Sequence, residues 1–346
     1  MKPSSSVFDG VLARGGVAEQ VSGRAWLQAL LDFEAALARA QAGAGIISEA
    51  EADAIAAICD ADRYDVAEIG AGAAEIGNPA GAVVKALKAA TDAPVHHGAT
   101  SQDAVDTAMM LVVKRALVPL LGDLRGAANA AAALAKEHRD TPIMGRTLLQ
   151  DAKPTTFGLK AAGWMVSLDE AADHLHSVRL AYQLGGPVGT LEPLKLDLGL
   201  DAPLIPWHTL RGRVGELAGA LGVACGAIGK AARDVTLMGE VRERVGGGST
   251  SMPHKHNPVA AISTLGCTRQ APGLVATLLA AMEQEHERAA GAWHSEWAPL
   301  NQLLITTGSA ASWLRTCLET LEVHPTDADA DTGAAALLVD RALEAR

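Results

Sequence analysis

One stretch of this 346-residue chain indicates its fold and its chemistry together: Gly248-Ser249-Thr250-Ser251-Met252-Pro253-His254-Lys255-His256-Asn257-Pro258. Three consecutive glycines, residues 246–248, let the backbone move and approach a ligand closely. Ser249 and its two neighbours supply hydroxyl groups, and Lys255 supplies a cation for an anionic substrate. Asn257-Pro258 is typical of an N-cap followed by proline in the first helical position. The residues favour equally a mobile loop that carries a proton-transfer group and a solvated loop between helices.

The same stretch matches every letter of G-S-x-x-M-P-x-K-x-N-P, and so it resembles the signature loop of the fumarase/aspartase superfamily. The resemblance implies an all-α fold, a fumarase/aspartase-like long antiparallel helix bundle with a smaller N-terminal helical domain. It also implies a homotetramer whose active sites are shared between subunits. We expect an N-terminal helical domain over residues 1–97 and a central helix bundle over 98–325. Residues 326–346 are expected to be a short C-terminal remnant, with the third domain largely absent.

Composition is consistent with a cytoplasmic, soluble enzyme. The chain is 49% hydrophobic and 20% charged, and aromatic residues make up only 3%, which suits closely packed long helices. The net charge of −11 disfavours binding to nucleic acid or to an anionic membrane surface. No apolar run is long enough to span a bilayer. The four cysteines contain no C-x-x-C pair, which argues against a zinc site or a disulfide framework.

Periodicity predicts helix after helix, and no convincing two-residue alternation predicts a strand. The expected helices cover residues 24–43, a segment capped by Ser48 and Glu51, a segment from about Thr100 to Pro119, a segment opened by Pro154, and residues 210–244 and 258–287.

A second candidate site begins at His96 and ends at Asp103. Hydroxyls and free backbone N–H groups at a helix N-terminus can bind an anion, although an ordinary N-cap has the same pattern. The segment resembles the superfamily's T-S-x-D carboxylate-binding motif. The resemblance implies that Thr100, Ser101 and Gln102 hold a substrate carboxylate, and His96 matches a histidine often found upstream. Adjacent histidines on a bend rarely face one ion, so we expect no metal.

The third candidate site, residues 145–154, resembles the superfamily's G-R-T-H-x-x-x-A-x-P region, and the resemblance implies that Arg146 and Gln150 bind substrate. Leu148 stands where fumarases and adenylosuccinate lyases have a catalytic histidine. Ile262 stands where those relatives have the glutamate that orients it. An elimination needs a general base and a general acid. Addition of the substrate's own carboxylate to its double bond needs only one proton, so the paired loss favours the second reaction.

That reaction belongs to the lactonising branch of the superfamily, the 3-carboxy-cis,cis-muconate cycloisomerases of the protocatechuate branch of the beta-ketoadipate pathway. The chain resembles this branch in five stretches: residues 8–15, 24–36, 97–103, 183–190 and 284–288. One departure is Asp151, where the branch is expected to have histidine. The alternatives are a fumarate-releasing lyase such as adenylosuccinate lyase, and a non-catalytic relative.

The resemblance also implies a role for each site residue. Ser249 is the first choice for the proton donor, with Lys255 as its rival, and His96 hydrogen-bonds a carboxylate or relays protons. Lys255 and Asn257 hold the carboxylate whose α-carbon is protonated, and Met252 is counted among the substrate-binding residues. Arg14 and Arg288 are candidates for local positive charge. The expected partner is a small-molecule polycarboxylate, and no cofactor or metal is implied.

Overall fold

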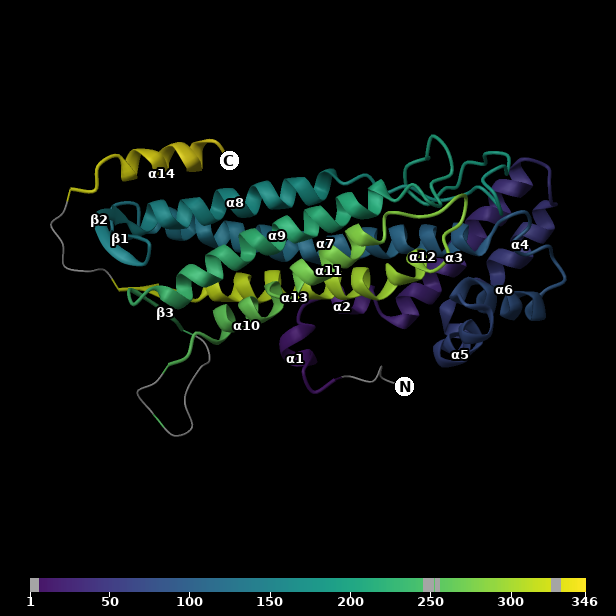
Figure 1. The fold of residues 1–346 in the computed structure, drawn as a ribbon, viewed down its shortest axis with the longest axis horizontal. Coiled ribbons are helices and arrows are strands. Elements are labelled where there is room, and N and C mark those ends of the chain that lie inside the picture. The colour runs from purple at the N-terminus through teal and green to yellow at the C-terminus, as the bar shows by residue number, and fades with distance from the viewer. Residues whose placement is uncertain (1–5, 245–251, 253–255, 325–330) are drawn as a thin grey trace.

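The fold is a bundle of long antiparallel helices, shown in Figure 1. The computed structural model describes residues 6–244, 252, 256–324 and 331–346. The bundle is built from α7 (Ser101–Glu137), α8 (Phe157–Ser177), α9 (Gly212–Leu237) and α13 (Trp297–Glu319). The predicted all-α fold class is confirmed, with two small two-stranded sheets in addition.

The remaining elements lie along the bundle or at its ends. They are α1 (Asp9–Leu12), α2 (Val17–Gln20), α3 (Gly23–Gly43), α4 (Glu49–Ile58), the 3-10 turn Ala61–Arg63, α5 (Val66–Ile76), α6 (Pro79–Ala90), α10 (Val259–Thr268), α11 (Ala271–Ala280), α12 (Ala292–Ser295) and α14 (Ala335–Glu344). Helices α3 to α6 gather at the end of the bundle where α7 begins (Figure 1).

Small side chains explain how the long helices pack closely. The buried face of α7 includes Ala108, Ala127, Ala128 and Ala131, none of which has measurable solvent exposure. Alanine has the highest helix propensity and lets a neighbouring helix approach closely. One continuous hydrophobic core joins α3 to the bundle helices. The domain boundary at residue 97 therefore stays a prediction.

The segment around Pro154 differs from the prediction. Pro154 lies within a strand, β2 (Gln150–Thr156), which pairs antiparallel with β1 (Pro142–Thr147). Helix α8 begins only at Phe157, where the Thr156 hydroxyl accepts a hydrogen bond from the Leu159 N–H at 3.1 Å. A two-stranded sheet has two edges, so proline is tolerated there, and the polar hairpin gave no alternating apolar signal.

Three predicted helix bounds were also wrong. The helix expected over residues 210–244 ends at Leu237, and β3 (Val241–Glu243) follows it. Helix α7 continues through Pro119 to Glu137, because tertiary packing on both sides outweighs the loss of one backbone hydrogen bond. The segment 258–287 is two helices, α10 and α11, and Pro272 lies in the first turn of the second.

The predicted Asn257 N-cap of α10 is not observed. The carboxylate of Glu243 accepts hydrogen bonds from the N–H groups of Ala260 and Ala261 at 2.9 and 2.8 Å. Glu243 belongs to β3 (Val241–Glu243), which pairs with β4 (Leu321–Val323). The donors at the start of α10 are therefore satisfied from a distant strand.

Helix α9 alone, within the described residues, is long and apolar enough to cross a bilayer. Most of its central window is buried against the other bundle helices, as in the core helix of a soluble protein. Helix α14 packs against α8 and is held by Asp340, which accepts hydrogen bonds from Arg139 at 2.5 and 2.7 Å.

Candidate active site

The N-terminus of α7 presents polar groups next to a cation. The Thr100 hydroxyl accepts a hydrogen bond from the Arg288 guanidinium at 2.6 Å. Ser101 is half-buried, and its hydroxyl has no hydrogen-bond partner within the described residues. The first backbone N–H groups of a helix lack intrahelical acceptors and carry the positive end of the helix dipole. Together these groups are a candidate anion-binding site on a chain with a net charge of −11.

Arg288 completes this site from far along the sequence. Its guanidinium lies 5.8 Å from the ring centre of Trp293, and its side chain is half-buried. Burial lowers the pKa of Arg288, and the charges of Asp103 and Asp106 oppose that effect. Arg14, the other predicted source of charge, lies over Trp313 and donates to Thr316 near the opposite end of α13. Of the two arginines, only Arg288 reaches Thr100.

Asp103 fixes the glycine-rich loop beside the site. Its carboxylate accepts hydrogen bonds from the N–H groups of Gly185 and Gly186 at 3.0 and 2.9 Å, and it lies 2.7 Å from Nε2 of His208. Gly186 has a left-handed backbone with φ of 66°, and a Cβ there would lie 3.0 Å from the Gly98 carbonyl oxygen. Only glycine allows this close approach without a clash.

A buried ionic layer supports the start of α7 from below. Arg211 donates to Asp106 at 2.8 Å and to Glu296 at 2.5 Å, and Trp293 Nε1 donates to Asp106 at 3.0 Å. Burial raises the pKa of Glu296, while Arg211 counteracts that effect. Because all these groups are hydrogen-bonded, the layer is rigid and holds the binding hydroxyls in place.

Gln102 belongs to this layer and not to the mouth of the site. Its side chain is buried, and its amide donates to the His208 carbonyl at 2.8 Å and to Asp106 at 3.2 Å. Its Oε1 is buried and makes no hydrogen bond within the described residues. The substrate-binding role of Gln102 stays a prediction.

The third motif lies at the other end of the bundle. Arg146, in β1, donates to Glu240 at 2.7 Å and to Asp151 at 3.0 Å, and Glu240 raises the pKa of Arg146. Gln150 is exposed at the start of β2. Asp151, the departure from the expected histidine, is thus the ion-pair partner of Arg146.

The two residues at the hairpin tip, Leu148 and Leu149, are 96% and 73% exposed. Both have left-handed backbones, with φ of 52° and 65°. Ile262, at the position of the missing glutamate, is also exposed, on α10. The two apolar replacements therefore lie on the surface of the subunit.

Helix α7 separates the predicted site residues within one chain. It contains 37 residues, which at 1.5 Å per residue span about 55 Å, with Thr100 before its start and the hairpin after its end (Figure 1). Asn257 precedes α10, is half-buried, and has no side-chain hydrogen bond to the described residues. Met252 is 41% exposed. Ser249 and Lys255 lie outside the described residues.

His96 lies four residues before Thr100, and its Nδ1 is 2.6 Å from the Glu34 carboxylate. Among the residues that the structure describes, no cluster of three or more His, Cys, Asp or Glu side chains is arranged to hold a metal ion. The expectation that the enzyme uses neither metal nor cofactor stays a prediction.

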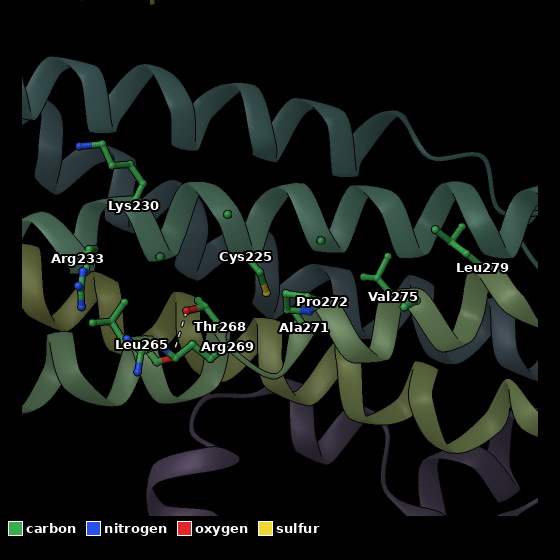
Figure 2. A pocket seen from close by; sticks show the side chains of 14 residues that line it. Cys225, Lys230, Arg233, Leu265, Thr268, Arg269, Ala271, Pro272, Val275 and Leu279 are labelled. Carbon is green, nitrogen blue, oxygen red and sulfur yellow. Dashed lines mark hydrogen bonds between the residues drawn. The ribbon is translucent and has the colours of Figure 1, made fainter. Parts of the chain in front are cut away.

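A groove of about 760 Å³ lies between α9 and the pair α10–α11, and Figure 2 shows its lining. Its lining includes Gly222, Gly226 and Gly229 of α9 and Val275 and Leu279 of α11. None of the predicted site residues lines it. The groove is mostly apolar, and the Thr268 hydroxyl and the cationic side chains Lys230, Arg233 and Arg269 also line it.

Comparisons with known proteins agree on the relatives of this chain. The family described as Lyase matches residues 14–273. The 3-carboxy-cis,cis-muconate cycloisomerase of Bradyrhizobium diazoefficiens is 46% identical over 87% of this chain and 73% of that protein. The nitrosuccinate lyase of Streptomyces davaonensis is 39% identical over 94% of this chain and 76% of that protein. The crystal structure of the 3-carboxy-cis,cis-muconate lactonizing enzyme from Pseudomonas putida matches with a TM-score of 0.85 and 38% identity, over 98% of this chain and 80% of that one.

Proposed function

We propose, from the premise that this chain belongs to the lyase family, that it is a cycloisomerase that converts 3-carboxy-cis,cis-muconate into 4-carboxymuconolactone. The observation that carries the proposal is the anion site formed by Thr100, Ser101 and Arg288, combined with apolar residues at positions 148 and 262. The substrate is a tricarboxylate and needs a local cation. The reaction needs no second acid–base group, so Leu148 and Ile262 are compatible with it. The 46% identity to a cycloisomerase supports the same substrate.

In the proposed mechanism, Thr100, Ser101 and Arg288 hold one substrate carboxylate at the helix N-terminus. Lys255 and Asn257 hold the carboxylate next to the carbon that becomes protonated, and they stabilise the enolate-like charge that develops there. An oxygen of another substrate carboxylate attacks the double bond, so one C–O bond forms. Ser249 delivers one proton to the adjacent carbon, with Lys255 as the rival donor, and no group leaves.

His96 has two possible tasks in this mechanism: hydrogen bonding to a substrate carboxylate, or proton relay. Arg146, Gln150 and Met252 are proposed to contact substrate from other subunits. Gln102 is proposed to act indirectly: its amide donates hydrogen bonds to Asp106 and to the His208 carbonyl, within the ionic layer that holds the start of α7.

We further infer a homotetramer in which each active site combines residues of several subunits. The separation of about 55 Å along α7 supports this, because Thr100 and the hairpin of one chain cannot contact the same small molecule. The groove of Figure 2 supports it too, since its lining is mostly apolar and a Cβ at Gly226 would have no atom within 4 Å, which leaves room for another helix. A soluble enzyme of aromatic catabolism of this kind is expected in the cytoplasm.

A lyase activity has one specific observation in its favour, the 39% identity to nitrosuccinate lyase. An elimination requires a base and a leaving group, and position 148 provides no base. Adenylosuccinate cleavage and a purely structural role have no comparable support.

The decisive experiment follows the ultraviolet absorbance of 3-carboxy-cis,cis-muconate with EDTA-treated protein and identifies the product by NMR. We expect loss of the diene band, a lactone product, and loss of activity in Ser249→Ala. Ser177→Ala is a matched control, because the Ser177 hydroxyl bonds only its own helix at His174. An unchanged diene band with folded, tetrameric protein would contradict the proposal, and cleavage of nitrosuccinate would favour the lyase.

Complementation between subunits tests the shared site. Thr100 precedes α7 and Asn257 precedes α10, and we propose that they serve different active sites of the tetramer. Mixed tetramers of the inactive variants Thr100→Val and Asn257→Ala should therefore regain activity. Thr100→Val mixed with Arg288→Ala should not, since these residues contact one another in the same subunit. Full activity at monomer mass would contradict the shared site.

A further inference from the structure

Two buried polar residues of α3 face the segment that leads into the anion site. Glu34 and Gln41 are each 2% exposed, and they are the buried polar residues of this helix. They are seven residues apart, which places them on one face, two turns from each other. The Glu34 carboxylate lies 2.6 Å from His96 Nδ1, and Gln41 Nε2 donates to the His97 carbonyl at 2.7 Å. Both polar groups therefore hold residues 96 and 97.

The burial of Glu34 is costly and requires an explanation. Its neighbours on α3 include Leu30, Leu31 and Phe33, all buried. A carboxylate in such surroundings is retained only with a partner, and His96 is the one that its Oε1 has. Its Oε2 is buried and makes no hydrogen bond within the described residues. The surroundings thus favour one specific contact, between Glu34 and His96.

His96 is held in an unusual conformation. Its backbone is left-handed, with φ of 60°, which is uncommon outside glycine. Its ring lies edge-on to Phe33, with centroids 6.3 Å apart, and its side chain is 13% exposed. Strained residues of this kind persist where the surroundings over-determine them, often at functional sites. Four residues further on, Thr100 binds Arg288.

The contact with Glu34 also determines which ring nitrogen is available. Because a carboxylate only accepts hydrogen bonds, we assign the hydrogen of the Glu34–His96 contact to Nδ1 of His96. Nε2 has no hydrogen-bond partner within the described part of the chain. The nitrogen left free is therefore the one that can accept a proton.

We propose that Glu34 is a positioning residue that orients His96 and fixes its Nδ1–H tautomer, so that Nε2 serves the substrate. This inference rests on the proposed function, because it places His96 beside the bound tricarboxylate. The Glu34–His96 pair would then be a glutamate that orients a histidine within one subunit. Fumarases and adenylosuccinate lyases have a different glutamate–histidine pair, at the positions that Leu148 and Ile262 occupy in this chain.

Kinetics of Glu34 variants test the proposal. Glu34→Leu removes the acceptor and should lower kcat by about tenfold or more with little change in KM, because the histidine loses its orientation but the carboxylate-binding groups stay. Glu34→Gln keeps an acceptor oxygen and should retain most of the activity. Asp32→Asn is the matched control: Asp32 is on the same helix and pairs with Arg115 at 2.5 Å, and its loss should leave kcat unchanged.

The double variant separates orientation from general support of the fold. The double variant Glu34→Leu/His96→Gln should have the same kcat as His96→Gln alone, because Glu34 has no histidine left to orient. Fully additive losses, or a KM that rises equally in Glu34→Leu and Gln41→Leu, would overturn the proposal in favour of a structural role.

A readout independent of turnover is the nitrogen NMR spectrum of histidine-labelled protein. The wild type should show a His96 signal of the Nδ1–H tautomer, assigned by its absence in His96→Gln and kept in Glu34→Gln. If the wild type fails to convert the tricarboxylate but the tautomer is fixed, the proposed function fails and the orienting contact stands. If Glu34→Leu does not fold, the same NMR measurement on Glu34→Gln replaces it, and this variant should keep the Nδ1–H tautomer of His96. A mixture of the two His96 tautomers in the wild type would refute the inference.

Discussion

The carboxylate of Glu243 caps the helix that follows the signature loop, accepting the N–H of Ala260 at 2.9 Å. It accepts the N–H of Ala261 as well, so one buried side chain satisfies two donors at the start of α10. Residues 243 and 260 lie on the two sides of that loop. The cap therefore fixes both ends of the stretch that contains Ser249 and Lys255.

We expect Glu243→Ala to lower the free energy of unfolding by about 2 kcal/mol, since capping hydrogen bonds to a charged, buried group are lost. Urea unfolding measures this change. Glu322→Gln is the control, because its ion pair with Arg244 is exposed and should contribute less than about 1 kcal/mol. Equal stabilities of the two variants would contradict the importance of the cap.

Arg288 is expected to supply much of the substrate's binding energy. Arg288→Ala should lower kcat/KM by about 10- to 100-fold, because a hydrogen bond to a charged group contributes about 1.5–3 kcal/mol. Steady-state kinetics on the tricarboxylate measures it. Arg14→Ala, which removes an arginine stacked on Trp313, should leave KM unchanged. An unchanged kcat/KM in Arg288→Ala would remove Arg288 from the site.

Local patterns predicted the parts of the molecule that depend on neighbours in sequence. The residues 24–43 form a helix as expected, and Ser48 with Glu51 forms the predicted capping box. Thr100 and Ser101 were identified because hydroxyls at a helix start are a local signal. The hairpin around Pro154 was missed, since its polar residues show no alternation.

Contacts across long sequence separations could not be predicted from the sequence. Arg288 reaches Thr100 across 188 positions, and Glu34 reaches His96 across 62. No motif at either residue specifies its partner, because the packing of α3, α7 and the segment before α12 brings them together. In the sequence, Glu34 is a charged residue on the apolar face of a predicted helix. Its role could be interpreted only once the structure showed that His96 is its partner.

Buried thiols should make the fold sensitive to alkaline pH. Burial raises the pKa of Cys225 from 9.0 to about 11 and that of Cys59 to about 12. A thiol with a higher pKa in the folded state ionises more easily in the unfolded state. Its contribution to the free energy of unfolding is therefore complete below pH 9 and is lost as the pH rises towards 11 and 12. Thermal melts between pH 8 and 11 should show this decline, and Cys225→Ala should reduce it. A flat profile would contradict the raised pKa values.

The hairpin tip combines strain with exposure in a way that predicts a trade-off. Thr147 pairs with Gln150, so Leu148 and Leu149 form a two-residue turn with positive φ at both positions, a turn that favours Asn-Gly. Leu148→Asn combined with Leu149→Gly should relieve strain and stabilise the fold by about 1 kcal/mol. If the tip contacts substrate in another subunit, the same change should lower kcat/KM, because the apolar contact is lost.

Melting temperature and turnover of this double variant, compared at one protein concentration, measure both effects. Val118→Asn serves as the control, since Val118 is 71% exposed on α7 and is not part of the proposed site. Its turnover should match that of the wild type. Higher stability with reduced turnover in the tip variant would indicate that the leucines are kept for function despite their backbone strain. Higher stability with full turnover would show that the tip lies outside every active site of the assembly.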